Sequence, residues 1–202
     1  MSDGAEDSSL GFERVVFFSD AVFAIVITLL VLPLTAEFEV PEDTASLAHE
    51  LAELWPKIVT FGVSFLVVGQ FWMAHHRVFS RIARADSGLL ALNLLFLLTV
   101  SFMPFPAAVL GAFELDEDAL VRVFYAASLT VVSIVLTVVW LYAQRRGLLR
   151  PAVTPAKASE VMAGSLTTDA VFVVSIAAAY FSFLAAVLCW VVLMPIARRL
   201  IG

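Results

Sequence analysis

The stretch FERVVFFSDAVFAIVITLLVLPL, residues 12–34, decides the fold of this chain. Its only charged residues, Glu13, Arg14 and Asp20, lie near its start, and most of the other side chains are apolar. A helix needs about 20 consecutive, mainly apolar residues to cross the hydrocarbon core of a bilayer. We therefore expect this stretch to span a membrane, with Pro33 closing the helix.

The rest of the chain repeats this pattern of apolar runs separated by charged loops. Hydrophobic residues make up 61% of the 202 residues and charged residues 15%, against roughly 25% charged residues in a soluble domain. The sequence predicts an all-α integral membrane protein, with an acidic cytoplasmic amino terminus at residues 1–11 and one six-helix domain at residues 12–202. The expected spans are about 12–34, 55–79, 89–111, 121–143, 160–180 and 182–200.

Several local features refine these spans. Pro104 and Pro106 are expected to kink or end the third span, and Tyr180-Phe181-Ser182 is the expected turn between the fifth and sixth. A short amphipathic helix is expected outside the membrane at about residues 45–54. Four aromatic residues near span ends are expected to form belts at the membrane surface: Trp55, Tyr125, Trp140 and Tyr142.

The loop charges predict the orientation of the chain. The loops after the first and third spans are acidic, whereas Arg and Lys residues follow the second, fourth and sixth spans. Because basic loops remain in the cytoplasm, both termini are expected there. The segment Met1–Ser9 is acidic, unlike the start of a signal peptide, so the first span is expected to remain in the mature protein.

Composition also excludes several classes of function. A single cysteine, Cys189, rules out an internal disulfide framework and a zinc site built from thiolates. A net charge of −6 with only 12 Lys and Arg residues argues against nucleic acid as a partner. Phosphate-binding, dinucleotide-binding and metalloprotease motifs are absent from the sequence, so we do not expect an enzyme.

The first span presents two different faces if it is a regular helix. At 100° per residue, Ile25, Leu29 and Leu32 fall within about 40° of one line, and Thr28 lies about 60° to one side. Asp20 points about 140° away from Ile25. Such an apolar face suits either the lining of an ion pathway or a surface covered by lipid or protein, and spacing alone favours the second interpretation.

Three motifs in this order resemble a known family. They are Arg14-x-x-x-Phe18-Ser19-Asp20 in the first span, Trp72-Met-Ala-His75-His76-Arg-Val-Phe79 in the second, and Asn93 to Pro106 with Ser101 in the third. Residues 12–111 are similar to the endosomal and lysosomal potassium-channel family called transmembrane protein 175. Beyond Gly111 the resemblance rests only on the pattern of spans.

The resemblance implies a homotetrameric, potassium-permeable channel in a prokaryotic cytoplasmic membrane, with the lipid bilayer and potassium ions as its partners and no cofactor. In this family the first helices surround the pore. Carried over by position, Ile25 would form the narrowest ring, Leu29 and Leu32 would continue the apolar lining, and Thr28 would favour potassium. The TVGYG filter of other potassium channels is absent from this sequence.

Seven polar residues of spans one to three are expected to form one cluster that fixes the first helix against its neighbours: Arg14, Ser19, Asp20, His75, His76, Asn93 and Ser101. For Asp20 a structural role is favoured over ion binding, because its side chain points away from Ile25. Arg14 is compatible both with the pore face and with the membrane edge. A metal site at the two histidines is not expected, because adjacent helical residues point about 100° apart.

Asp169, within the predicted fifth span, leaves two interpretations open. It suits a helix cap, if this helix begins later than residue 160, or a buried position beside the polar cluster. The alternative function is a proton-coupled or ion-coupled transporter in which Asp20, His75 and Asp169 form a relay. A membrane protein that conducts nothing is the third interpretation.

Overall fold

The computed structural model describes residues 3–36, 43–113 and 118–193, most of which are helical. The helices are α1 (Asp3–Leu29), α2 (Leu32–Ala36), α3 (Thr44–Glu53), α4 (Trp55–Phe79), α5 (Ser87–Phe102), α6 (Pro104–Gly111), α7 (Ala119–Arg145), α8 (Pro155–Phe181), α9 (Phe183–Val187) and the π-helix η1 (Leu188–Leu193). In this part of the chain the only β-structure is one antiparallel bridge between Ile82 and Leu149. The all-α architecture predicted from the sequence is confirmed.

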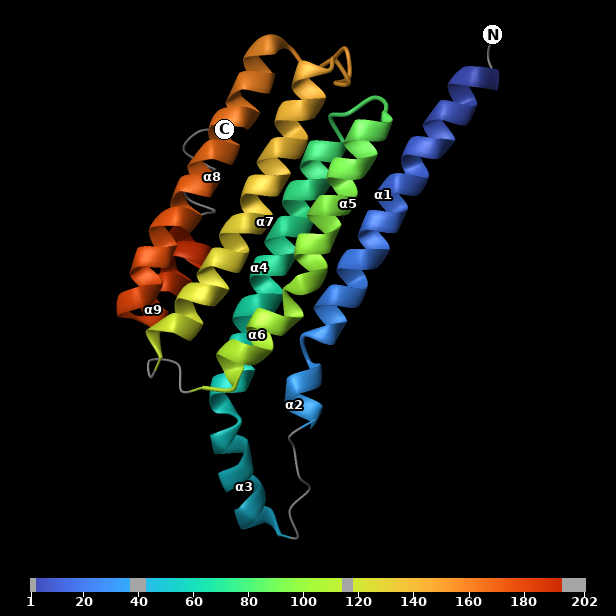
Figure 1. The fold of residues 1–202 in the computed structure, drawn as a ribbon. Coiled ribbons are helices and arrows are strands. Elements are labelled where there is room, and N and C mark those ends of the chain that lie inside the picture. The colour runs from blue at the N-terminus through green and yellow to red at the C-terminus, as the bar shows by residue number, and fades with distance from the viewer. Residues whose placement is uncertain (1–2, 37–42, 114–117, 194–202) are drawn as a thin grey trace.

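Five stretches of the described residues are long and apolar enough to cross a membrane: 11–36, 55–79, 87–111, 119–145 and 155–181. They stand side by side in one bundle (Figure 1). The helix is interrupted at Ser182, whose backbone is extended, and α9 and η1 then pack against α8. The sixth span predicted from the sequence, residues 182–200, stays a prediction, because α9 and η1 account for residues 183–193 and its end, from residue 194, lies outside the described residues.

Capping side chains and prolines explain where the helices begin. Several helices start at a side chain that accepts a hydrogen bond from a free N–H of the first turn. These caps are Asp43 for α3, Asp86 for α5, Asp118 for α7 and Thr154 for α8. Pro104, which lacks an N–H, separates α5 from α6 at Met103, so the third span is bent where the sequence predicted.

The two ends of the bundle differ in charge. The start of α1 and the loops at 80–86 and 146–154 lie at one end, while α2, α3 and α6 lie at the other (Figure 1). The two loops are tied together, because the Ala83 N–H donates to the Leu148 carbonyl at 2.8 Å and the Arg150 N–H to the Arg81 carbonyl at 2.9 Å. Cationic side chains gather at this basic end: Arg77, Arg81, Arg84, Arg145, Arg146, Arg150 and Lys157.

The centre of the bundle is α7, which packs against α4, α5, α6 and α8. Its residues Tyr125 and Trp140 are fully buried, so the prediction that they lie in aromatic belts is wrong. Tyr125 shares a hydrogen bond of 2.8 Å with Ser64 of α4, and its ring lies 5.2 Å from that of Trp190. The side of α7 that faces the other helices buries these aromatic residues in the protein rather than at the membrane surface.

Candidate functional site

Helix α1 lies at the edge of the bundle, against α4 and α5 (Figure 1). The buried residues of α1 are Phe12, Ser19, Phe23 and Val26. At 100° per residue these four side chains share one side of the helix. The described part of the chain leaves the opposite side uncovered.

The uncovered side carries the residues predicted to line a pore. Ile25 is 58% exposed, Phe18 53% and Leu29 39%, and Thr28 is exposed between them. An apolar surface of this kind on a membrane protein has to be covered either by lipid or by other subunits.

Thr28 uses its hydroxyl proton within its own helix. Its Oγ1 donates a hydrogen bond of 2.8 Å to the carbonyl of Ile25. A hydroxyl oxygen that donates its only proton still has lone pairs to offer. The exposed side of α1 therefore holds an oxygen atom that can accept a hydrogen bond or contact a cation.

Leu32 does not lie on the same helix as Ile25. Helix α1 ends at Leu29, and Leu32 is the first residue of α2, where it is 52% exposed. Pro33 explains the break, because it has no N–H to donate to the Leu29 carbonyl and its ring collides with that carbonyl in a continuous helix. The prediction that Leu32 continues the line of Ile25 on one regular helix is therefore wrong.

Three of the predicted polar residues form one buried chain of hydrogen bonds. Asn93 of α5 donates through Nδ2 to the Ser19 hydroxyl at 3.0 Å, and its Oδ1 lies 3.0 Å from Nε2 of His75. Ser19 in turn donates to the Val15 carbonyl at 2.9 Å. Because the amide oxygen only accepts, His75 donates from Nε2. This chain joins α1, α4 and α5.

The His75 ring is held between two phenyl rings. Its centroid lies 4.1 Å from that of Phe79 and 5.4 Å from that of Phe96, and both ring pairs are stacked. The residue is 0% exposed. Such packing fixes the orientation of the imidazole and suits a residue that positions helices.

The other four polar residues lie outside this chain. Asp20 makes a separate link between α1 and α4, because its Oδ1 accepts a hydrogen bond of 2.9 Å from Nε1 of Trp72. Arg14, His76 and Ser101 are exposed. The single cluster predicted from the sequence is therefore wrong, because neighbouring helical residues such as Ser19 and Asp20 point about 100° apart.

Within the described residues no three His, Cys, Asp or Glu side chains are grouped as metal ligands would be.

Asp169 occupies neither of its two predicted positions. It lies in the middle of α8, which begins at Pro155 and is capped by Thr154. Its Oδ1 accepts a hydrogen bond from the hydroxyl of Ser133 on α7. Because α8 begins earlier than predicted, Asp169 is too far along the helix to cap it, and it contacts α7 instead of the buried chain of Ser19, Asn93 and His75.

Sequence reasoning missed the role of Arg122, the second residue of the predicted fourth span, 121–143. Arg122 is buried, and its Nε donates to the Ala179 carbonyl at 2.7 Å while Nη2 donates to the Tyr180 carbonyl at 3.1 Å. These carbonyls belong to the last turn of α8, where the helix dipole favours a cation. The only signal in the sequence is a single cation at the start of an apolar run.

Comparisons with known proteins agree with this architecture. Residues 14–104 match the family described as the endosomal/lysosomal potassium channel TMEM175. A protein named a potassium channel in Chamaesiphon minutus is 38% identical over 148 residues, which cover 71% of this chain and 70% of the relative. A protein named a potassium channel in Streptomyces collinus is 38% identical over 138 residues, which cover 66% of this chain and 65% of the relative. The human protein named endosomal/lysosomal proton channel TMEM175 is 31% identical over 111 residues, 54% of this chain and 22% of that protein.

A solved structure extends the similarity to the second half of the chain. The crystal structure of a lysosomal potassium-selective channel TMEM175 homologue from Chamaesiphon minutus superimposes with a TM-score of 0.78 at 29% identity. The match covers 95% of this chain and 98% of that one, so it includes the helices after residue 111, for which the sequence offered only a pattern of spans. The chain belongs to the TMEM175 family.

Proposed function

We propose that this chain is one subunit of a potassium-permeable channel, in which four copies surround a pore lined by α1. The observation that carries this proposal is the uncovered side of α1, with Ile25, Thr28 and Leu29, in a chain whose bacterial relatives are named potassium channels. Fourfold symmetry places the same side of every α1 on one axis. The matches span about two thirds of these relatives, at 65% and 70% of their lengths.

The narrowest part of this pore is a ring of Ile25 side chains. A hydrated cation cannot replace its water with methyl groups, so an apolar ring closes the pore by excluding water. The pore conducts when the ring widens enough to stay wet. The Thr28 oxygens, one turn further along, offer partial compensation for lost water, while Leu29 and Leu32 extend the apolar lining.

Two sets of contacts keep α1 rotated about its axis so that its uncovered side faces away from the subunit. The Ser19–Asn93–His75 chain holds its buried side against α4 and α5, and the Asp20–Trp72 hydrogen bond adds a second link to α4. Polar contacts between membrane helices are specific in direction, so they fix which residues of α1 face away from the subunit.

The channel lies in the cytoplasmic membrane, with both termini and the basic end of the bundle in the cytoplasm. The gathering of Arg and Lys side chains at this end supports the orientation, because basic loops stay on the cytoplasmic side. Conduction needs no cofactor, only permeant potassium ions.

Flux into liposomes tests the proposal. The purified protein is expected to carry potassium down its gradient without a second substrate, and Ile25→Ser is expected to raise this flux several-fold and lower the preference for potassium over sodium. The matched control is Ile134→Ser, which changes an exposed isoleucine on α7 that is not on the pore face. Absence of wild-type flux, or identical behaviour of the two variants, contradicts the proposal.

The same liposomes separate the channel from a coupled transporter. A relay requires Asp20, His75 and Asp169 to communicate, but each of the three makes its contacts with a different set of residues. Potassium flux that requires a proton gradient would favour the transporter. Recording proton flux with a pH-sensitive dye adds the comparison with the animal relatives, which are named proton channels.

A further inference from the structure

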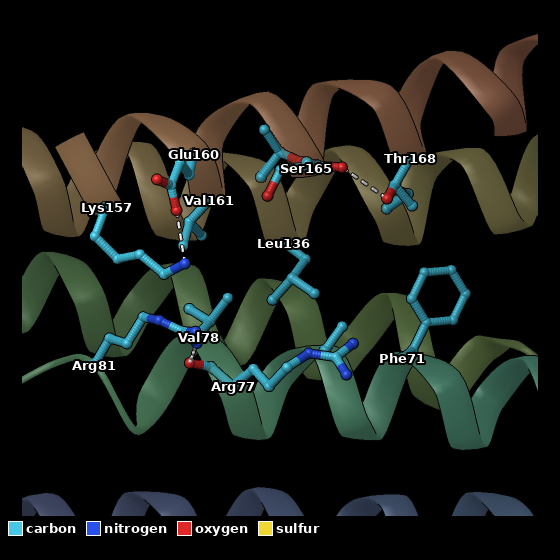
Figure 2. A pocket seen from close by; sticks show the side chains of 14 residues that line it. Phe71, Arg77, Val78, Arg81, Leu136, Lys157, Glu160, Val161, Ser165 and Thr168 are labelled. Carbon is cyan, nitrogen blue, oxygen red and sulfur yellow. Dashed lines mark hydrogen bonds and ion pairs between the residues drawn. The ribbon is translucent and has the colours of Figure 1, made fainter. Parts of the chain in front are cut away.

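A crevice between α4, α7 and α8 begins at the basic end of the bundle and takes no part in the proposed pore (Figure 2). Its volume is about 280 Å³, close to the lower end of the range for small-molecule sites, roughly 300 Å³. Its lining changes with depth from charged to apolar, as a site for an amphiphile requires.

The mouth of the crevice is cationic. Arg77 lies in the last turn of α4 and Arg81 just after its end, while Lys157 and Glu160 come from the start of α8 (Figure 2). The only carboxylate among the lining residues, that of Glu160, already forms an ion pair, because Lys157 Nζ lies 2.6 Å from Glu160 Oε2. Three cations and one carboxylate leave an excess of two positive charges.

The two arginines are placed where they repel each other. They are four residues apart, so their side chains lie on the same side of the chain as it leaves α4. Arg81 donates through Nη1 to the Arg77 carbonyl at 2.5 Å, and within the described residues neither guanidinium forms an ion pair. An anion between the two guanidinium groups would remove this repulsion.

The deeper part of the crevice carries no charged residue from α7 or α8 and has several apolar side chains. Phe71 of α4, Leu136 of α7 and Val161 of α8 line it, and Figure 2 shows Phe71 and Leu136 further along the crevice than Lys157 and Arg81. Four hydroxyl side chains also line the crevice: Ser133, Thr137, Ser165 and Thr168. A ligand with an anionic head at the mouth and a hydrocarbon tail directed inwards fits both parts.

We propose that this crevice binds an anionic phospholipid of the cytoplasmic leaflet, with its phosphate between Arg77 and Arg81 and one acyl chain against Phe71 and Leu136. Arginine is suited to phosphate, because its planar guanidinium donates two parallel hydrogen bonds. Basic pockets between membrane helices on the cytoplasmic side bind anionic lipid head groups. The inference rests on the orientation proposed above, and the bound lipid links α4 to α8 away from the pore.

Lipid retention, measured without any ion flux, tests this proposal separately from conduction. The full-length protein is titrated with phosphatidylglycerol or phosphatidylcholine, and the bound lipids are counted by native mass spectrometry. The wild type is expected to retain phosphatidylglycerol preferentially. The double variant Arg77→Gln/Arg81→Gln is expected to lose roughly 30-fold in apparent affinity for it, from about 1 kcal/mol for each cation removed.

Matched variants control for charge and folding. Arg84→Gln/Arg145→Gln removes two exposed cations from the same end of the bundle but outside the crevice. Because exposed charges are screened, it is expected to change the affinity by less than about threefold. Arg77→Lys/Arg81→Lys keeps both charges and is expected to retain most of the binding, and its elution volume in detergent checks the fold.

Four results would overturn the proposal. The first is equal retention of the two lipids, and the second is an equal loss of affinity in the two glutamine variants. The third is displacement of phosphatidylglycerol by millimolar inorganic phosphate. The fourth is a disulfide between cysteines introduced by Val161→Cys and Ala197→Cys in a Cys189→Ala background. The third result would assign the mouth to a free anion, and the fourth would place the chain's own carboxyl-terminal segment in the crevice.

Discussion

Thr28 places one oxygen atom next to the proposed apolar ring. Thr28→Ala removes this oxygen, whereas Thr28→Ser keeps it. Because one hydrogen-bond-scale contact is worth about 1 kcal/mol, the alanine variant is expected to lower the potassium-to-sodium permeability ratio roughly fivefold, and the serine variant to keep it. Reversal potentials in planar bilayers measure this ratio.

The matched control for Thr28 is Thr99 on α5. Its hydroxyl also donates to a carbonyl of its own helix, that of Phe96, at 2.7 Å. Thr99→Ala is expected to leave the permeability ratio unchanged. If both alanine variants lower the ratio equally, the effect does not come from the pore surface.

Asn93 is the central member of the buried hydrogen-bond chain. Asn93→Ala leaves Ser19 and His75 without this partner in a site from which water is excluded. The free energy of unfolding is expected to fall by about 1–2 kcal/mol, measured by thermal denaturation in detergent. Leu94→Ala, at an exposed neighbouring position, is the control and is expected to cost less than about 0.5 kcal/mol. Equal losses would show that the chain of hydrogen bonds adds no stability.

The end of helix α8 depends on a residue from another helix. Arg122 of α7 donates hydrogen bonds to the carbonyls of Ala179 and Tyr180, just before the helix is interrupted at Ser182. Arg122→Gln shortens the side chain and removes the charge, so stability is expected to fall by roughly 2 kcal/mol. Thermal denaturation checks this against Arg145→Gln, an exposed arginine on the same helix; a similar loss in both variants would contradict the assignment.

Helix α5 is joined to α7 by Asp86, outside the membrane-spanning segments. Hydrogen bonds from the Leu89 N–H and the Tyr142 hydroxyl, together with Arg146, hold the pKa of the Asp86 carboxyl below its usual value of 3.8, although partial desolvation opposes this. A lowered pKa in the folded state stabilises the protein above the unfolded pKa, and this stabilisation is lost as pH falls through the folded pKa.

Asp86→Asn tests this pH dependence. The wild type is expected to exceed the variant in stability by a constant amount at neutral pH, and the difference is expected to shrink as pH falls below about 3.8. Denaturation midpoints of both proteins across this range give the comparison. A difference that does not change with pH would mean that the carboxylate charge is not responsible.

The helices were predictable from the sequence because their causes are local. Long apolar runs must be helical in a membrane, where every backbone N–H and carbonyl needs an internal partner. The bend at Pro104 follows from a missing N–H, and the break at Ser182 follows from an apolar region too long for one span. These features need no knowledge of neighbouring helices.

The misjudged features depend on contacts between distant parts of the chain. Asp169 was misplaced because only its partner Ser133, on another helix, explains its position. Tyr125 was misplaced because its burial depends on α7 lying at the centre of the bundle. Leu32 is the exception, because the clash between Pro33 and the Leu29 carbonyl is local and explains the end of the helix without any distant contact.

At the scale of the whole molecule, the proposed pore requires an assembly of several copies. A single copy leaves Ile25 and its neighbours uncovered at the edge of the bundle, and four copies around an axis would bring them together. Native mass spectrometry is expected to show four chains of 22.0 kDa in one particle. A monomer or dimer in mild detergent would contradict the proposed pore.

Cadmium block distinguishes an axial position from a peripheral one within such a tetramer. In a Cys189→Ala background, Ile25→Cys places one thiol from each subunit around the axis. Soft thiolates that converge in this way bind Cd²⁺, so micromolar Cd²⁺ is expected to abolish potassium flux in liposomes. Ile134→Cys, on the outer surface of α7, places its thiols far apart and is expected to conduct in Cd²⁺ as before. If Cd²⁺ acts equally on both variants or on neither, α1 does not face the axis, whatever the number of subunits.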